Sequence, residues 1–569
     1  MENKLGLALS GGGFRASLFH IGILTSLAEL DILKNIEVIS CVSGGSIIGA
    51  YYYLHLKKLL ELKQDSEIRK EDFIDIMREI QVDFLKGVQK NIRVRVFGNV
   101  WKTIKMTRAD YSRSDRIAEL YDQLFYNKFL PYFNKDPRKG RISLRELLIQ
   151  PKGSEKPFDL RRNNENRTNK VPMLILNSTT LNTGRNWQFT AIDMGERDPD
   201  IDYSLFDKNS LLKAVEYYGQ ELKGEQYEKY RNIPLSIAVS ASACVPALFA
   251  PLALTDLYPE VIPQLVDGGV YDNQGLSTIF YEKCTEVIIS DAGGQVNFIR
   301  DPSTNFYNVL SRTNSVLMNQ LRNEGLESAV MRKKTKMLDK KIILHLKKDL
   351  DIDSIYPGQR EPMADKAKKQ NTTYGINKYV QYLMSNIRTD LDSFTDVEAH
   401  SLMYDGYAMA KQDLESQVSN QVYQDKLWDF LQIKEYCEGK KNCSDYRKQL
   451  KFSSKKVLKA YRLMPYLNPL GIIIVLLSLI PIAVLVYGYI QIPERILQIN
   501  KICFVVAVIV LSIITGIPRL ISVRETLIFK IPMNILFVMF SLSAFILSWL
   551  HLKIIDPFFI KRGMVRNLK

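Results

Sequence analysis

The order of apolar and polar positions predicts an α/β body followed by an apolar C-terminal tail. Short apolar runs at Lys4–Ser10 and Glu37–Ser40 each lead into a turn rich in small residues. A segment with helical spacing follows each turn, over Ala16–Leu30 in the first case and to about Glu61 in the second. Strand, turn and helix in this alternation are typical of a parallel sheet covered by helices.

The same patterns continue along the body. Further strands are predicted at Pro172–Ser178, Trp187–Ala191, Gln264–Asp267, Val287–Ser290 and Lys341–Leu346, and helices at Phe306–Arg322, Thr373–Phe394 and Val397–Val418. Residues 62–150 fit a helical insertion. Within it, residues 81–108 interleave basic and aromatic side chains, which favours either a membrane-interface element or a solvated helix packed on the core.

The tail contains three uncharged apolar runs, at residues 470–490, 502–518 and 531–550. Because about 20 residues cross a hydrocarbon core, each run is a predicted membrane span, with a buried soluble hairpin as the alternative. The predicted organisation is therefore a body at 1–420, a basic helical linker at 421–465 and a membrane region at 466–569. Three spans place the two basic ends on opposite sides, against the usual charge asymmetry, so a re-entrant middle run stays open.

Charge supports a membrane as the partner. The formal net charge of the 569 residues is +15, and basic residues gather just ahead of the first apolar run. They are Arg447, Lys448, Lys451, Lys455, Lys456, Lys459 and Arg462. This is the usual place of a cytoplasmic flank that faces anionic lipid, and the sequence contains no recognised nucleic-acid module. We therefore expect a multi-pass membrane protein with its body facing the cytoplasm, an anionic membrane surface as partner and no nucleic acid.

The chemistry of the body begins at Ser43. It lies between a predicted strand and a predicted helix, in the sequence Cys41-Val42-Ser43-Gly44-Gly45. A serine on such a sharp turn projects its hydroxyl, and the helix N-terminus behind it favours developing negative charge. Ser43 is thus a candidate nucleophile, although a helix N-cap serine would show the same local pattern.

A glycine loop precedes it at Gly11-Gly12-Gly13-Phe14-Arg15. Backbone amides of Gly11, Gly12, Gly13 and of Gly44 are candidate oxyanion donors, since glycines let the backbone approach a substrate. Arg15 is expected either to bind a lipid phosphate or to clamp the loop. The alternative is a dinucleotide site, because Gly11, Gly13 and the residue at position 16 also fit the G-x-G-x-x-A fingerprint.

The candidate base is Asp267, at a predicted strand end in Asp267-Gly268-Gly269. A carboxylate held there can accept the serine proton without a histidine. Asp291, in Asp291-Ala292-Gly293-Gly294, has a similar setting and is a second candidate. A Ser-His-Asp triad using His345 or His400 is less favoured, because only two predicted strands precede the serine. The sequence has neither an H-E-x-x-H motif nor a CxxC pair, so no metal or cofactor is predicted.

Taken together, the glycine loop, the serine turn and the Asp267 motif resemble the patatin-like phospholipases in content and order. Two further stretches look like this family, Leu176–Phe189 and Ala241–Phe249. The resemblance spans roughly Lys4–Gly406 and implies a three-layer α/β/α fold with a Ser43–Asp267 dyad. Cys41 and Ala16 depart from the family pattern, where glycine is usual.

The expected function is therefore a membrane-anchored lipid acyl hydrolase that cleaves membrane phospholipids, with residues 81–108 as a candidate gate. A catalytically silent membrane scaffold and a nucleotide-binding membrane protein are the alternatives.

Overall fold

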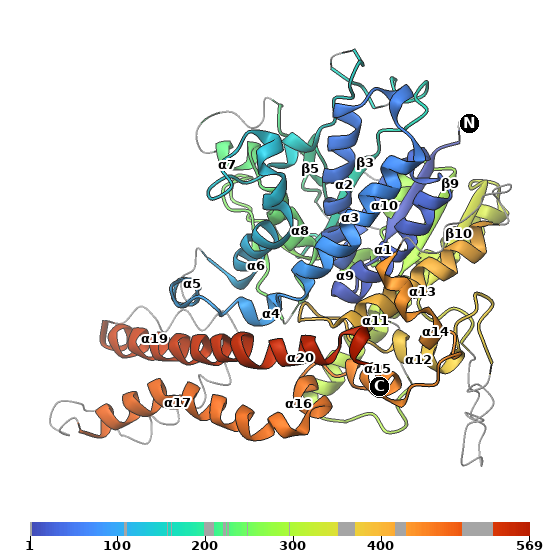
Figure 1. The fold of residues 1–569 in the computed structure, drawn as a ribbon. Coiled ribbons are helices and arrows are strands. Elements are labelled where there is room, and N and C mark those ends of the chain that lie inside the picture. Colours follow the sequence, from blue (N-terminus) through green and yellow to red (C-terminus); the bar gives the residue numbers. More distant parts are fainter. Residues whose placement is uncertain are drawn as a thin grey trace.

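A computed structural model describes residues 3–106, 111–155, 157–160, 162–197, 210–219, 224, 227–246, 248–294, 296, 298–350, 370–415, 428–491 and 527–568. Within these residues, one ten-stranded sheet forms the centre of the body, in the order β10-β9-β1-β2-β3-β4-β5-β6 with β8 and β7 beside β3 (Figure 1). The strands are β1 (Leu5–Leu9), β2 (Ile36–Val42), β3 (Met173–Thr180), β4 (Asn186–Phe189), β5 (Asp193–Glu196), β6 (Val215–Glu216), β7 (Leu252–Ala253), β8 (Gln264–Asp267), β9 (Glu286–Asp291) and β10 (Lys340–His345).

The sheet is mixed, whereas the sequence pattern predicts a parallel one. β10, β9, β1, β2 and β3 are parallel to one another, as predicted, but β4, β5 and β6 follow as antiparallel neighbours. The reason is the short connection after β3. Gly184 has a φ of 75° and the Thr180 amide donates to the Arg185 carbonyl at 3.0 Å, which closes a tight turn. Such a short connection permits only antiparallel pairing.

Helices pack on both faces of the sheet, as side chains on β1 show. Leu7 and Leu9 belong to the large core with α1, α2 and α13, whereas Ala8 belongs to a smaller core with α10 and α11. The helices are α1 (Gly13–Glu29), α2 (Gly44–Leu62), α3 (Lys70–Val88), α4 (Ile92–Arg95), α5 (Val100–Lys105), α6 (Arg113–Tyr121), α7 (Glu228–Arg231), α8 (Leu235–Ser242), α9 (Gly269–Asp272), α10 (Leu276–Tyr281), α11 (Phe306–Lys334), α12 (Lys378–Ser385), α13 (Asp396–Glu415), α14 (Lys434–Cys437), α15 (Ser444–Ser453), α16 (Lys459–Leu463), α17 (Asn468–Gln491), α19 (Leu527–Leu550) and α20 (Asp556–Arg562).

One helix, α12, is much shorter than the sequence predicts. The apolar spacing over Thr373–Phe394 predicts a single helix, but α12 covers only Lys378–Ser385. The chain then forms an irregular loop up to α13, in which Arg388 and Asp392 are almost fully buried. Their charged groups bind partners from distant parts of the chain, and these contacts replace helical packing.

Two helices of the tail are long and apolar enough to cross a membrane, judged by length and composition. The qualifying stretches are Pro465–Val484 and Val538–Arg562. In Figure 1, α17 and α19 lie side by side below the body, and the ends of the pair nearest the body continue into α16 and α20. The predicted middle span, at 502–518, lies outside the described residues.

Candidate functional site

The sheet register brings Ser43 and Asp267 together. Both β2 and β4 pair with β3 at Leu176, so these two strands lie on opposite sides of β3. Both β4 and β8 pair with β3 at Thr179, so β8 lies on the same side as β2. The strands β2 and β8 therefore approach each other end to end along β3. The residue just after β2 and the last residue of β8 meet there.

Ser43 occupies this meeting point in an unusual backbone conformation. Its φ is 51° and its ψ is −116°, between the end of β2 and the start of α2. A non-glycine residue in such a sparsely populated region costs on the order of 1–3 kcal/mol, and such strain clusters at functional sites. The side chain does not cap α2, so the N-cap alternative is wrong. Instead Ser43 lies near Asp267 and acts to lower the pKa of that carboxyl group.

Asp267 is buried with few partners. Besides Ser43, its carboxylate accepts a hydrogen bond from the Gly269 amide at 2.8 Å. No ion pair links it to a Lys, Arg or His anywhere in the described chain. Burial raises the pKa of Asp267 to about 6, and the hydrogen bonds from Gly269 and Ser43 offset part of this effect. A carboxyl group with this pKa is ionised at neutral pH and basic enough to accept a proton from a hydroxyl.

The glycine loop, defined here as Gly11–Gly13, lies directly against the Ser43 turn. A Cβ on Gly44 would lie 2.0 Å from the Gly13 carbonyl oxygen. A Cβ on Gly11 would lie 3.2 Å from the Cβ of Ser43. Gly12 and Gly13 have φ values of 143° and 56°, which side chains rarely allow. This tight contact is the physical reason for glycine at these positions.

The amides of this loop differ in what they bind. The Gly11 amide donates to the Asn273 carbonyl at 2.9 Å, so Gly11 is removed from the predicted oxyanion donors. The amides of Gly12, Gly13 and Gly44 donate to no backbone acceptor among the described residues. Gly13 and Gly44 are the first residues of α1 and α2, where helical amides have no intrahelical partner. These three amides are the candidates for binding an oxyanion.

Arg15 does not have the substrate-binding position predicted for it. Its side chain is buried and donates to the carbonyls of Ile387 at 2.8 Å, Ala292 at 2.7 Å and Ser385 at 3.4 Å. Burial lowers its pKa to about 10, with Asp291 acting in the opposite direction. Arg15 therefore clamps the base of the glycine loop, which was the second of its two expected roles.

The rival base, Asp291, is held by a cation. Arg322 on α11 binds its carboxylate through two nitrogens, each at 2.7 Å. Burial alone would raise the pKa of Asp291, but Arg322 and the Gly293 amide hold it below the ordinary value. Asp291 thus belongs to a structural ion pair, and in the described part of the chain its carboxylate makes no contact with Ser43.

Two residues of the site carried no signal in the local sequence. The Ser242 hydroxyl accepts a hydrogen bond from the Ser43 amide at 3.0 Å and contacts the Ser46 hydroxyl at 2.7 Å. The Ser242 carbonyl accepts from the Gly268 amide at 3.2 Å, so this one residue joins the two halves of the site. Asn273 is the second, because its side chain fills the space beside Gly11 and Gly269. Ser242 lies in the Ala241–Phe249 stretch, whose resemblance to the family was its only signal.

The alternatives based on histidine and on a nucleotide lack support in the geometry. His345 accepts a hydrogen bond from the Lys347 amide at 3.0 Å, and His400 is buried within α13. No histidine contacts Ser43 or Asp267 among the contacts of the described residues. A dinucleotide would need the free N-terminus of α1, but the Phe14 amide there donates to the Asp390 carbonyl at 3.0 Å. Groups of side chains that could hold a metal ion are absent from the described part of the chain.

Comparison with known proteins gives one family match. A family model described as patatin-like phospholipase matches residues 7–278, so this part of the chain carries a patatin-like phospholipase domain. This confirms the resemblance predicted from the motifs. Strands β9 and β10, which complete the sheet, lie beyond the matched residues.

Solved structures with low overall similarity include two complexes of human GIVD cytosolic phospholipase A2. The complex with methyl gamma-linolenyl fluorophosphonate and terbium chloride has 11% identity and a TM-score of 0.35, and the complex without terbium has 13% and 0.34. These alignments cover 73% of this chain but only 59% and 58% of the human chain. VipD from Legionella pneumophila has 12% identity and a TM-score of 0.27, with 100% of this chain and 94% of that chain covered. No curated protein matches the sequence.

In the patatin-like domain, both site residues are covered. The exposed fraction is 5% for Ser43 and 5% for Asp267. The helix α6 packs on α8, which carries Ser242, and Tyr121 at the end of α6 is buried near Asp267, where burial and then this carboxylate raise its pKa. Ser43 and Asp267 are therefore almost inaccessible to solvent in this structure.

Proposed function

We propose that the protein is a membrane-anchored lipid acyl hydrolase of the phospholipase A or lysophospholipase type, with Ser43 as nucleophile and Asp267 as base. The observation that carries the proposal is the strained Ser43 at the meeting point of β2 and β8, beside the buried carboxyl group of Asp267. The patatin-like family match supports a lipid ester as the substrate.

The reaction follows from these positions. The Ser43 oxygen attacks the ester carbonyl carbon while Asp267 takes its proton. The resulting oxyanion is bound by the amides of Gly12, Gly13 and Gly44, and these are stronger donors here than in water because the site is buried. When the ester C–O bond breaks, Asp267 returns the proton to the leaving lysolipid oxygen.

Water then completes the cycle. Asp267, ionised again, takes a proton from a water molecule that attacks the acyl group on Ser43. The bond to the Ser43 oxygen breaks, the serine recovers its proton, and the fatty acid leaves. The atoms balance as one ester plus one water giving one acid and one alcohol, without any metal or cofactor in a step.

The tail supplies the anchor in this proposal. One stretch that fits a membrane span ends within α17, the other runs from α19 into α20, and basic residues precede the first. We propose that the patatin-like domain faces the cytoplasm and an anionic membrane surface. Anchoring raises the effective concentration of the enzyme at its lipid substrate.

The test is fatty-acid release from mixed phospholipid vesicles, measured by mass spectrometry with purified full-length protein. The Asp267→Asn variant should lose about 10²–10⁴-fold in rate, because general base catalysis contributes that much. Ser43→Ala should fall to the background rate. Ser26→Ala is a matched control, since its buried hydroxyl has no hydrogen-bond partner.

The outcomes separate the alternatives. Release that persists in Ser43→Ala would overturn the assignment of the nucleophile. No release by the wild type on vesicles or on a soluble short-chain ester, with intact folding, would favour the catalytically silent scaffold.

A further inference from the structure

The loop between α12 and α13 connects the glycine loop to the base of the membrane helices. On one side, the Asp390 carbonyl accepts the Phe14 amide at 3.0 Å, and a Cβ on Gly13 would lie 2.7 Å from that carbonyl oxygen. Arg15 donates to the Ile387 carbonyl at 2.8 Å. The backbone around Asp390 therefore determines where the amides of the glycine loop can lie.

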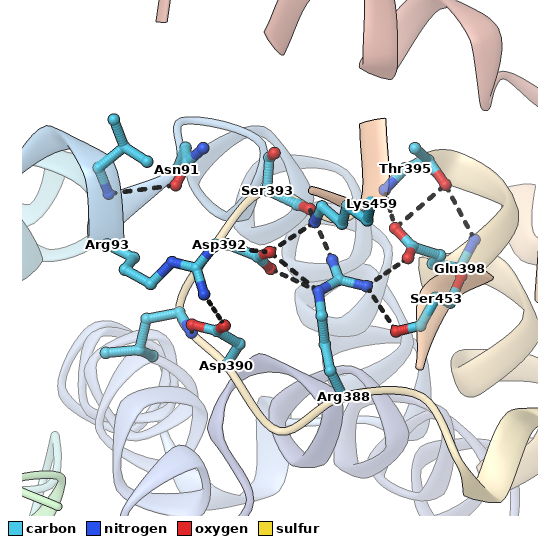
Figure 2. A network of polar contacts seen from close by, with 12 residues as sticks. Asn91, Arg93, Arg388, Asp390, Asp392, Ser393, Thr395, Glu398, Ser453 and Lys459 are labelled. Atoms are coloured by element: carbon cyan, nitrogen blue, oxygen red, sulfur yellow. Dashed lines mark hydrogen bonds and ion pairs between the residues drawn. The ribbon is translucent and has the colours of Figure 1, made fainter. Parts of the chain in front are cut away.

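On its other side, this loop enters a buried cluster of charges. We call the cluster the charged junction, which consists of Arg93, Arg388, Asp390, Asp392, Glu398 and Lys459 (Figure 2). Figure 2 shows Arg388 at its centre, between Asp392 and Glu398. The side chains of Arg388, Asp392 and Glu398 are 0%, 1% and 2% exposed. Three basic and three acidic groups balance, and removal of Arg388 or Lys459 would leave a buried carboxylate without its full compensation, whereas Arg93 is partly exposed.

The contacts of Arg388 show how fixed this arrangement is. Its Nε donates to both carboxylate oxygens of Asp392, at 2.8 and 2.9 Å, and its other nitrogens bind Glu398 and the carbonyls of Ser393 and Ser453. Although burial acts against the charged form, Asp392 and Glu398 raise the pKa of Arg388 above its ordinary value. The group stays charged, so its geometry is maintained at all accessible pH values.

Two segments of the tail hold this loop, one just before the first candidate span and one inside the C-terminal part of the second. Lys459 on α16, before the first span, binds Asp392 at 2.7 Å and donates to the Ser393 carbonyl. Asp556 at the start of α20, after α19, accepts hydrogen bonds from Ser393 at 3.2 Å and from Asn91 at 2.7 Å. Apolar contacts that include Leu463 and Phe559 join the same two segments.

The predicted gate segment also takes part. Arg93 binds the Asp390 carboxylate, and its amide donates to the Leu391 carbonyl at 3.0 Å. Nearby, α5 and α4 pack against α19. The basic stretch 81–108 is thus partly fixed by the charged junction rather than wholly solvated.

We propose that the loop at residues 388–395 is a positioning element for the glycine loop, and that Lys459 and Asp556 couple it to the packing of the two membrane helices. The proposal rests on the proposed function of Ser43. In the packed state, the Asp390 carbonyl holds the Phe14 amide and so keeps the Gly12 and Gly13 amides where they can serve the oxyanion. A change in how the spans meet shifts Lys459 or Asp556, and the contiguous contacts carry this shift to the glycine loop.

The first experiment measures the reactivity of Ser43 directly. In full-length protein in detergent, a soluble fluorophosphonate is attacked at phosphorus by the Ser43 oxygen, fluoride leaves, and Asp267 takes the proton. This reaction uses the oxyanion amides but needs no membrane. Lys459→Met should lower its second-order rate constant by about tenfold per folded molecule, because small misplacement of catalytic groups has large kinetic effects.

The matched control is Arg562→Gln. Arg562 lies on α20 and forms an ion pair with Asp445, so this variant removes a charge at the base of the same helices without contacting the 388–395 loop. Its rate constant should stay within about twofold of the wild type. Asp556→Asn, which keeps the shape of the side chain, serves as a second and milder variant if Lys459→Met does not fold.

The second measurement does not depend on catalysis. Hydrogen exchange of the peptide covering residues 10–17 should quicken in Lys459→Met and in Asp556→Asn, but not in Arg562→Gln, because the Phe14 amide loses its fixed acceptor. Unchanged exchange and unchanged labelling in both variants would overturn the coupling. A wild type that neither labels nor hydrolyses, with exchange still altered in the variants, would instead refute the proposed function and leave the coupling in place.

Discussion

The ends of β8 and β9 make an instructive pair. Both place an aspartate at the last position of a strand, followed by glycines, and both carboxylates accept an amide two residues later. Asp291 at the end of β9 also binds Arg322, whereas Asp267 at the end of β8 has no ion pair among the described residues and lies near Ser43. The result is a pKa below the ordinary value for Asp291 and a pKa of about 6 for Asp267.

The difference shows what a buried carboxylate needs for each role. A cation partner stabilises the ionised form and makes the group a poor base. Burial without a cation leaves the pKa close to the working pH, which suits proton transfer but costs stability. The three predictions that follow test this contrast between Asp267 and Asp291.

The largest effect is expected from removal of the cation. Arg322→Met leaves Asp291 as an unpaired buried charge, which should lower the free energy of unfolding by about 3–5 kcal/mol. Urea unfolding followed by circular dichroism measures it. Arg332→Met on the same helix is the control, because Arg332 stacks on Phe280 at the surface and should contribute about 1 kcal/mol or less. Equal losses in the two variants would mean that Arg322 does not hold Asp291.

Replacement of either aspartate by asparagine should change the free energy of unfolding at pH 8, and the two changes should have opposite signs. The folded pKa of Asp267 is about 6 against an ordinary value of 3.8. Its contribution to stability is therefore present below pH 3.8 and lost as the pH rises through about 6. At pH 8, Asp267→Asn should raise the free energy of unfolding by up to about 3 kcal/mol, and the gain should shrink toward pH 4.

For Asp291 the sign is reversed. Its folded pKa is lowered, so its contribution is present above the ordinary pKa and lost as the pH falls through the folded value. Asp291→Asn should therefore lower the free energy of unfolding at pH 8. Unfolding of both variants at pH 4 and pH 8 checks the pair. If both variants changed the free energy of unfolding at pH 8 in the same direction, the proposed difference between Asp267 and Asp291 would be contradicted.

The smallest predicted effect concerns the pH at which kcat/KM stops rising. If ionised Asp267 is the base, kcat/KM on a soluble ester should rise about tenfold per pH unit at low pH and level off near pH 6. The pH at which kcat/KM levels off reports the pKa of the base in the free enzyme. In the Arg322→Met variant, the rise in kcat/KM should level off at the same pH as in the wild type, with the rates calculated for the folded fraction of the protein. Levelling off near pH 4 would mean that a different group accepts the proton.

Much of the fold followed from local patterns. β1, β2, β9 and β10 lie where the apolar runs predicted them, and so do α1 and α2. The mixed order of the sheet did not follow, because strand direction beyond β3 depends on one short turn. The true extent of α12 was also missed. The residues after it are held by ionic partners far away in the chain, to which no local propensity responds.

The site divides in the same way. The glycines, Ser43 and Asp267 carry motifs that the sequence shows directly, because a tight turn or a close backbone approach restricts which residues fit. The role of Arg15 was open between two alternatives, and only its three carbonyl partners identify it as a clamp. Ser242 gave no chemical signal, since its task is to bridge two loops that are distant in sequence.

What the sequence determined by itself is the set of residues able to do the chemistry and the order in which they occur. Its local patterns favoured Asp267 as the base but left Asp291, in a similar setting, as a second candidate. The tertiary structure decided between them, because β8 and β2 meet end to end along β3 while α11 brings Arg322 to the end of β9. Local sequence specifies conformation and chemistry over a few residues. The surroundings of a buried carboxylate come from segments far apart in the chain, and these set its pKa.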